Sequence, residues 1–141
     1  MDKVFFVMIG GSLGALSRYA VGLLAVRFFG SRFPFGTLAV NLVGCFLIGL
    51  SFSLSERGSY IMNPSIRLFF VTGYLGALTT FSTFALETVN TMRMESILAA
   101  LPNFLLNNIP GIGLVFLGMW AGQIDNLLDA IRKIQHWAGL L

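Results

Sequence analysis

Long apolar segments separated by short polar ones dominate the pattern of this 141-residue chain. A helix that crosses the hydrocarbon core of a bilayer needs about 20 consecutive, mostly apolar residues. Four segments meet this requirement, at about residues 4–26, 35–54, 66–92 and 97–122, and the connections between them are short. The pattern therefore predicts an all-α membrane protein with four transmembrane helices and no separate soluble domain.

A different pattern begins at Gln123. Apolar residues recur there at helical spacing, with charged residues on the opposite face of the same helix. Such a pattern is typical of an amphipathic helix that continues into water or lies along the membrane interface. We therefore divide the chain into a four-helix membrane unit, residues 1–122, and an amphipathic C-terminal extension, residues 123–141.

Composition strengthens the membrane assignment and argues against other functions. Hydrophobic residues make up 56% of the chain and charged residues only 11%, whereas soluble domains carry about 25% charged residues. The net charge of +3 does not indicate nucleic-acid binding, because the basic residues stand singly at the ends of apolar segments, where membrane proteins place them. The single cysteine, Cys45, lies inside an apolar segment and is expected to be a small packing residue.

The distribution of basic residues leaves the orientation of the chain open. An even number of spans puts both termini on one side of the membrane. That side carries five basic residues and the other side three, namely Lys3, Arg57, Arg67, Arg132 and Lys133 against Arg27, Arg32 and Arg93. This bias is weak under the positive-inside rule. Both a single orientation and insertion in two orientations, which would lead to an antiparallel dimer, are consistent with it.

The third apolar segment contains the most informative stretch of the sequence, the run Thr72-Gly-Tyr-Leu-Gly-Ala-Leu-Thr-Thr-Phe-Ser-Thr-Phe-Ala-Leu-Glu87. Two glycines, Gly73 and Gly76, followed by Thr79 and Thr80, predict a helix that breaks from Gly76 to Thr79. A break at membrane depth frees backbone carbonyls, which is tolerated where they line a cavity. Such carbonyls commonly coordinate ions, and an all-oxygen site suits a hard cation such as Na⁺.

Beyond the break, polar groups follow one side of the helix. Thr80, Thr83 and Glu87 fall on one stripe, and Phe81 and Phe84 are neighbours on a face. The edge of an aromatic ring is positive, so ring edges can line the path of an anion without binding it tightly. Spacing alone, however, favours a packing role for the two phenylalanines.

Arg18 is a charged residue inside the first predicted span. It shares a helix face with Gly11 and Gly14, and small residues of this kind permit close helix approach. One interpretation is a structural arginine that caps carbonyls or pairs with Glu87. The other is an electropositive group that draws anions inward.

Amide side chains stand at helical spacing on the second and fourth segments. Thr37 and Asn41 share one face, and Asn103, Asn107 and Gly111 share another. An asparagine offers two N–H donors and one acceptor without a charge. Interhelical hydrogen bonds and donors for an anion are both consistent with this pattern.

The chain resembles the Fluc family of small bacterial fluoride channels in three motifs. They are Gly10-Gly-Ser-Leu-Gly-Ala-Leu-Ser-Arg18, Gly36-Thr-Leu-Ala-Val-Asn-Leu-Val-Gly44 and the run from Thr72 to Glu87 described above. The order and spacing of the motifs agree with the family across residues 10–87, and the third motif is highly specific.

This resemblance implies an antiparallel, dual-topology homodimer in the bacterial cytoplasmic (inner) membrane. Two pores would let fluoride leave the cytoplasm passively, and a structural Na⁺ would lie at the dimer interface. The resemblance implies a channel rather than an enzyme, with the fluoride ion, a second copy of the chain and the lipid bilayer as partners. By motif, the ion path would include Thr37, Asn41, Thr80, Phe81, Ser82, Thr83, Phe84 and Glu87, with Arg18 near the vestibule and the carbonyls of Gly76 and Thr79 on the Na⁺.

The fourth segment departs from the family pattern. Family members often carry a small hydroxyl residue where this chain has Gly111, and a tyrosine or other polar residue near Asn103. We therefore expect Asn107, together with Asn103, to take over part of the pore lining.

Two other functions compete with the channel interpretation. A small proton-coupled exporter of cationic compounds would also have four helices, but it needs a carboxylate in the centre of the first span, where this chain has Arg18. A non-transporting assembly subunit would leave the polar run 72–87 without an explanation.

Overall fold

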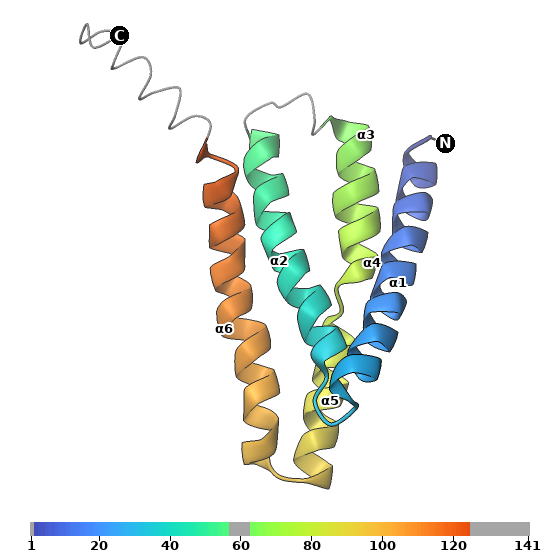
Figure 1. Ribbon diagram of the computed structural model, residues 1–141. Helices are drawn as coiled ribbons and strands as arrows, with labels where there is room; N and C mark the ends of the chain where they lie inside the picture. Colours follow the sequence, from blue (N-terminus) through green and yellow to red (C-terminus); the bar gives the residue numbers. More distant parts are fainter. Residues whose placement is uncertain (1, 57–62, 125–141) are drawn as a thin grey trace, which may run out of the picture.

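The computed structural model describes residues 2–56 and 63–124, so nearly all of the predicted amphipathic extension lies outside the described residues. Within these ranges the chain is helical and contains no β-strand (Figure 1). Its elements are α1 (Asp2–Phe29), α2 (Phe35–Glu56), α3 (Pro64–Arg67), the π-helical segment η2 (Leu68–Leu75), α4 (Gly76–Leu78), α5 (Phe81–Met94) and α6 (Ile97–Ala121).

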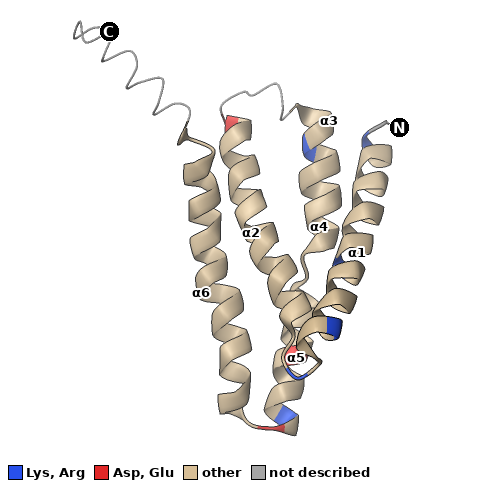
Figure 2. Ribbon diagram, viewed as in Figure 1, with Lys and Arg blue, Asp and Glu red and all other residues tan. Residues whose placement is uncertain are grey.

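Four helical stretches are long and apolar enough to cross a membrane. They are Lys3–Phe29, Phe35–Glu56, Pro64–Met94 and Ile97–Ala121. Each overlaps one predicted span, so the prediction of an all-α membrane protein with four spans is confirmed. The start of α1 and the end of α6 lie at the same end of the bundle (Figure 1), and most of the described charged residues lie near its two ends (Figure 2).

Local capping fixes where several helices begin and end. Asn63, Thr80 and Ser96 are the N-cap residues of α3, α5 and α6, and the side chain of each accepts a hydrogen bond from the backbone N–H three residues later. Such caps satisfy amide groups that have no partner inside the helix. Gly30, with φ of +77°, follows the last turn of α1 in the left-handed conformation that ends many helices.

Glycines let α1 approach the third span closely. A Cβ atom at Gly10 would collide with the carbonyl oxygen of Phe69, and one at Gly14 with the carbonyl oxygen of Tyr74. Gly11, which the sequence placed on the packing face, has no neighbour within 4 Å. Within the single chain Gly11 therefore does not pack against the third span, because it lies one residue, or about 100° of helix rotation, away from Gly10.

The same kind of contact joins α2 to α6. A Cβ at Gly49 would collide with the carbonyl of Val115, and one at Gly118 with the carbonyl of Phe46. A small buried core lies between α2 and the third span and consists of Val40, Leu75 and Leu78, with Val21, Leu47, Phe70 and Tyr74 packed around it. Most other large apolar side chains are exposed on the single chain, as expected for helices surrounded by lipid.

The π-helical segment is the one element that the sequence did not predict. It occupies eight residues, Leu68–Leu75, directly before the interruption of the third span. π-helical geometry is rare and usually confined to one turn at functional sites. The segment packs along α1, where the hydroxyl of Tyr74 donates to Ser17 Oγ over 3.3 Å, so α1 supports the wider turn that leads into the break.

Candidate functional site

The third span is interrupted at two extended residues, Thr79 and Thr80. Their angles are φ −81° and ψ 155° for Thr79 and φ −152° and ψ 111° for Thr80. The sequence predicted a break from Gly76 to Thr79. The structure confirms a break but moves it to the end of that range and one residue beyond, because Gly76 is helical with φ −61° and ψ −31°. Extended angles are open to any residue, so this break does not need a glycine.

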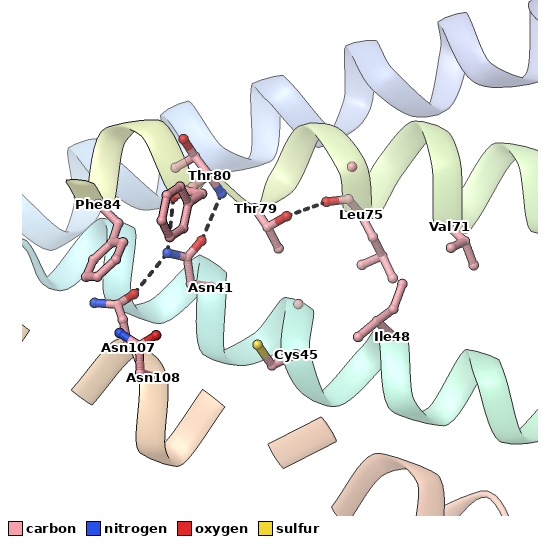
Figure 3. Close-up of a pocket in the computed structure, with 13 residues that line it drawn as sticks. Asn41, Cys45, Ile48, Val71, Leu75, Thr79, Thr80, Phe84, Asn107 and Asn108 are labelled. Carbon is pink, nitrogen blue, oxygen red and sulfur yellow. Dashed lines mark hydrogen bonds between the residues drawn. The ribbon is translucent and has the colours of Figure 1, made fainter. Parts of the chain in front are cut away.

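The side-chain amide of Asn41, on α2, replaces hydrogen bonds that the helix loses at the break (Figure 3). The Thr80 N–H donates to Asn41 Oδ1 over 2.8 Å, and Asn41 Nδ2 donates to the Thr80 carbonyl over 3.2 Å. In a continuous helix the Thr80 N–H would bond to the carbonyl of Gly76. Asn41 Oδ1 takes the place of that acceptor, so Asn41 joins two helices, one of the two roles considered from the sequence.

A chain of amide side chains leads from Asn41 to α6 and back to α5. Asn41 Nδ2 donates to Asn107 Oδ1 over 2.9 Å. Asn107 Nδ2 donates to the backbone carbonyl of Asn103 over 3.0 Å and to its Oδ1 over 2.9 Å. The buried Asn103 donates through Nδ2 to Thr88 Oγ1 over 2.9 Å, and the Thr88 hydroxyl donates to the carbonyl of Phe84 over 2.8 Å. These bonds tie α2, α5 and α6 together.

Thr88 is a buried polar residue that sequence reasoning missed. A signal for it was present, because Thr88 and Asn103 both lie seven residues from the connection 95–96 between α5 and α6. In two antiparallel helices joined by a short connection, residues equidistant from that connection lie opposite each other. The same rule places Phe84 opposite Asn107, each eleven residues from the connection.

Phe81 and Phe84 lie side by side at the start of α5, with ring centroids 5.5 Å apart and ring planes 59° apart. Phe84 is only 5% exposed and also faces Phe104, at a centroid distance of 6.3 Å. Phe81 is 77% exposed on the single chain. Packing within the chain therefore accounts for Phe84 but leaves the large exposed ring of Phe81 without an explanation.

Three hydroxyl groups cluster at the N-terminus of α5. Thr80 Oγ1 accepts from the Thr83 N–H over 3.2 Å, donates to Thr83 Oγ1 over 2.9 Å and lies 3.4 Å from Ser82 Oγ. The N-terminus of a helix carries a partial positive charge and unpaired N–H groups. The hydroxyl cluster therefore lies in a field that favours an anion.

Thr37 and Glu87 are joined across 50 residues of sequence. The Thr37 hydroxyl donates to Glu87 Oε1 over 2.7 Å. The other carboxyl oxygen, Oε2, is buried and has no hydrogen-bond partner. This pair connects α2 to the middle of α5, one helical turn and a half beyond the hydroxyl cluster.

Three cavities follow one another along these residues. The first, of about 350 Å³, is lined by Asn41, Gly76, Thr79, Thr80, Phe81, Phe84 and Asn107 among others (Figure 3). The second, of about 700 Å³, is lined by Arg18, Arg27, Thr37, Thr80 and Thr83 among others. The third, of about 310 Å³, is lined by Arg32, Thr37, Glu87 and Asn90 among others. Thr80 lines the first and second cavities, and Thr37 the second and third, so each pair of successive cavities shares a lining residue.

Most of the residues predicted for an ion path thus come together, and Ser82 is the exception, because it lines none of these three cavities. Arg18 lies in the second cavity with Thr37, Thr80 and Thr83. Arg18 makes no ion pair with Glu87, whose Oε2 has no partner at all. This geometry favours the interpretation of Arg18 as an electropositive group in a vestibule.

The cation ligands expected from the sequence are backbone carbonyls beside the break. In the described part of the chain, no three His, Cys, Asp or Glu side chains stand close enough together to hold a metal ion. Gly76 and Thr79 both line the first cavity, beside the break. The helical stretch that ends at Leu78 directs its C-terminal partial negative charge toward the same place, which favours a cation there.

Comparison with known proteins gives one consistent result. A family model described as CrcB-like protein, Camphor Resistance (CrcB), matches residues 5–119. The chain is 45% identical over 118 residues to proteins named fluoride-specific ion channel FluC from Shewanella halifaxensis and Shewanella pealeana, covering 84% of this chain and 94% of each relative. It is 42% identical over 132 residues to a protein of the same name from Parabacteroides distasonis, covering 94% of this chain and all of the relative.

Proposed function

The chain belongs to the CrcB family, and on this premise we propose that two antiparallel copies of it form a fluoride-selective, passive channel with two pores and a central structural Na⁺. The family is one of channels rather than enzymes, and four spans make this chain a multi-pass protein of the bacterial membrane. Fluoride would leave the cytoplasm down its own gradient.

The observation that carries the proposal is a set of three cavities in which Thr80 lines both the first and the second, and Thr37 both the second and the third. Arg18 and Arg27 line the wide second cavity, where they attract anions from solution. None of the residues that line the first cavity carries a charge. An anion would therefore pass from an electropositive vestibule into a smaller space without charge, where neutral donors and ring edges stand beside aliphatic side chains such as Ile48, Val71 and Leu75.

Such a space suits fluoride for a physical reason. Fluoride is small and strongly hydrated, so a pore has to replace its water with hydrogen-bond donors at close range. The hydroxyl of Thr80 and the amide of Asn41 in the first cavity, and the hydroxyl of Thr83 in the second, are donors of this kind without a fixed charge that would trap the ion. Conduction requires binding that is favourable enough for entry and weak enough for exit. Chloride is larger, and a narrow site lined by donors disfavours it.

Exposed groups at membrane depth support a second copy of the chain. Phe81, Ser82 and Thr83 are exposed on the single chain, in the middle of the third span. Polar side chains directed at lipid are costly, and they usually face a partner helix or a water-filled cavity. A second copy placed over the start of α5 would cover them, and the weak charge bias of the connections permits its insertion in the opposite orientation.

The two ends of the broken helix support the Na⁺ and the anion path together. The C-terminal end at Leu78 favours a cation, and the N-terminal end at Phe81 favours an anion. The carbonyls of Gly76 and Thr79 would hold the Na⁺, and bound there it would neutralise the negative helix ends of two subunits. One chain supplies only two such carbonyls, fewer than a hard cation usually takes. The site therefore fits an ion shared between two copies.

Fluoride efflux from liposomes tests the proposed function. Purified protein is reconstituted into liposomes loaded with potassium fluoride, and external fluoride is recorded with a selective electrode after a potassium ionophore is added. We expect rapid release of fluoride and little release of chloride from matched liposomes loaded with potassium chloride. Release of fluoride no faster than from protein-free liposomes would overturn the proposal.

Labelling of one connection tests the antiparallel arrangement separately. Ser31 lies in the connection between α1 and α2, and Cys45 is the only cysteine of the chain. In a Cys45→Ala background, Ser31→Cys should react with a membrane-impermeant maleimide from both sides of the cell membrane. Reaction from one side only would exclude insertion in two orientations without bearing on fluoride flux.

A further inference from the structure

The amide chain between α2 and α6 leaves few free donors at its centre. Asn41 Nδ2 has two N–H groups, and it donates to the Thr80 carbonyl and to Asn107 Oδ1. Asn107 Nδ2 also has two, and it donates to the backbone carbonyl and to Oδ1 of Asn103. Neither amide therefore has an N–H to spare for an anion unless one of these bonds opens.

Backbone groups fix the direction of this chain at both of its ends. The Thr80 N–H can only donate, so the side of the Asn41 amide that faces it has to be the oxygen. The backbone carbonyl of Asn103 can only accept, so the side of the Asn107 amide that faces it has to be the nitrogen. Only one arrangement remains between the two side chains, in which Asn41 donates and Asn107 accepts.

A buried pair reinforces the same direction. The Thr88 hydroxyl gives its proton to the Phe84 carbonyl and offers only lone pairs to Asn103. The amide nitrogen of Asn103 consequently faces Thr88, and its oxygen faces Asn107. A reversed Asn107 would then place its own oxygen against two acceptors of Asn103.

We infer that Asn107 acts as a built-in competitor of the anion. Its Oδ1 occupies, on Asn41 Nδ2, the position that a fluoride ion needs, and fluoride enters the first cavity by displacing this oxygen. The inference rests on the proposed function and deepens it, because it gives Asn107 the role of an acceptor that weakens binding. In the sequence-based expectation Asn107 was part of the pore lining, with the role of a donor left open.

A competing acceptor weakens the binding of fluoride. Asn107 Oδ1 is held in place by α6 and accepts from Asn41 Nδ2 without further ordering. If Asn107 were absent, a water molecule would have to be immobilised to accept from the same N–H group. A fluoride ion at Asn41 therefore gains less when it displaces Asn107 Oδ1 than it would gain on a free N–H. Weaker binding shortens the time that the ion spends in the site, and an ion that conducts has to leave.

The direction in which Asn107→Ala shifts the half-maximal fluoride concentration distinguishes a competitor from a donor. If Asn107 is a competitor, Asn107→Ala frees an N–H of Asn41, so the fluoride concentration that gives half-maximal flux should fall, by about 2- to 10-fold for one hydrogen bond. Maximal flux should fall as well, because the ion leaves more slowly. If Asn107 is a donor to the ion, the half-maximal concentration should rise instead. A rise or no change in Asn107→Ala would overturn the inference.

Ser12 provides the control. It lies on α1, its hydroxyl donates to the Met8 carbonyl of its own helix over 2.9 Å, and it lines none of the three cavities. Ser12→Ala should keep the half-maximal concentration of the wild-type protein. Asn107→Leu, which preserves the volume of the side chain, should shift the half-maximal concentration in the same direction as Asn107→Ala.

A measurement on the wild-type protein decides the matter even if both Asn107 variants fail to fold. With fluoride bound, dipolar coupling between ¹⁹F and side-chain ¹⁵N should identify Asn41 and not Asn107. Coupling to Asn107 as well would contradict the competitor role. These outcomes can be told apart from a failure of the proposed function. Absence of fluoride flux in the wild-type protein would refute the channel. Normal wild-type flux, together with a higher half-maximal fluoride concentration in Asn107→Ala, would refute only the role of Asn107 as a competitor.

Discussion

Thr37 and Glu87 share a hydrogen bond of 2.7 Å that connects α2 to α5, and within residues 2–56 and 63–124 it is the one hydrogen bond that the Glu87 carboxyl group makes. The Glu87 carboxyl group is partly buried and its Oε2 has no hydrogen-bond partner, so the bond from Thr37 offsets part of the cost of burying it. The bond also holds the side chain of Thr37, which lines both the second and the third cavity.

Thr37→Val should therefore destabilise the protein. The variant removes the donor and leaves both oxygens of Glu87 without a partner, which costs about 1–3 kcal/mol. Thr91→Val is the matched control, because the Thr91 hydroxyl donates only to the Glu87 carbonyl of its own helix. Thermal unfolding in detergent compares the two variants. Equal midpoints would show that the Thr37 bond contributes little.

Phe81→Ile and Phe84→Ile should abolish fluoride flux, because isoleucine has no ring edge to face the anion. Phe84 is buried, so Phe84→Ile should also lower stability, whereas the exposed Phe81 should tolerate the change. Phe116→Ile, at an exposed position on α6, serves as the control and should keep its flux. Liposome efflux measures all three. Wild-type flux in both Phe81→Ile and Phe84→Ile would reduce the pair to packing residues.

Two neighbouring glycines of α1 should respond oppositely to alanine. Gly14→Ala brings a methyl group against the Tyr74 carbonyl, and overpacking of this kind costs about 1–3 kcal/mol. Gly11→Ala meets no atom within 4 Å and should be neutral or stabilising, by up to about 1 kcal/mol from helix propensity. Unfolding midpoints of the two variants test this. A stable Gly14→Ala would mean that α1 can shift away from the π-helical segment.

Removal of Na⁺ should weaken the proposed dimer. Without the cation, two negative helix ends would face each other beside Gly76 and Thr79. Size-exclusion chromatography with light scattering measures the protein concentration below which the dimer separates into monomers. We expect this concentration to be higher in N-methyl-D-glucamine buffer than in sodium buffer. Dissociation curves that coincide in the two buffers would speak against a cation at the interface.

Hydropathy was sufficient to predict the four spans and their order, because lipid forces long apolar helices on any chain that crosses it. The break in the third span was also predictable from its glycines and threonines, although its position moved. Gly76 remained helical, since the extended angles of Thr79 and Thr80 are open to residues with side chains. A glycine in a membrane helix also marks close packing between helices.

Two features required coordinates. The π-helical segment Leu68–Leu75 has no periodicity that short windows reveal, and its backbone lies directly against Gly10 and Gly14 of α1, a contact between segments far apart in the sequence. The direction of the amide chain depends on which backbone group faces each asparagine, and a sequence does not contain that information. The two roles considered for Asn41 and Asn107 therefore could not be separated from the residue types alone.

The bond between Asn41 and Thr80 bears on how the chain enters the membrane during synthesis. Asn41 precedes Thr80 by 39 residues, so α2 is synthesised before the interrupted third span, and we expect it to enter the bilayer first. The unpaired backbone groups of that span would each cost several kcal/mol in lipid, and they meet a side chain that satisfies them on arrival. A rearranged gene that encoded α2 after α5 would insert the interruption before its partner existed, and we expect its product to be degraded faster than the natural order.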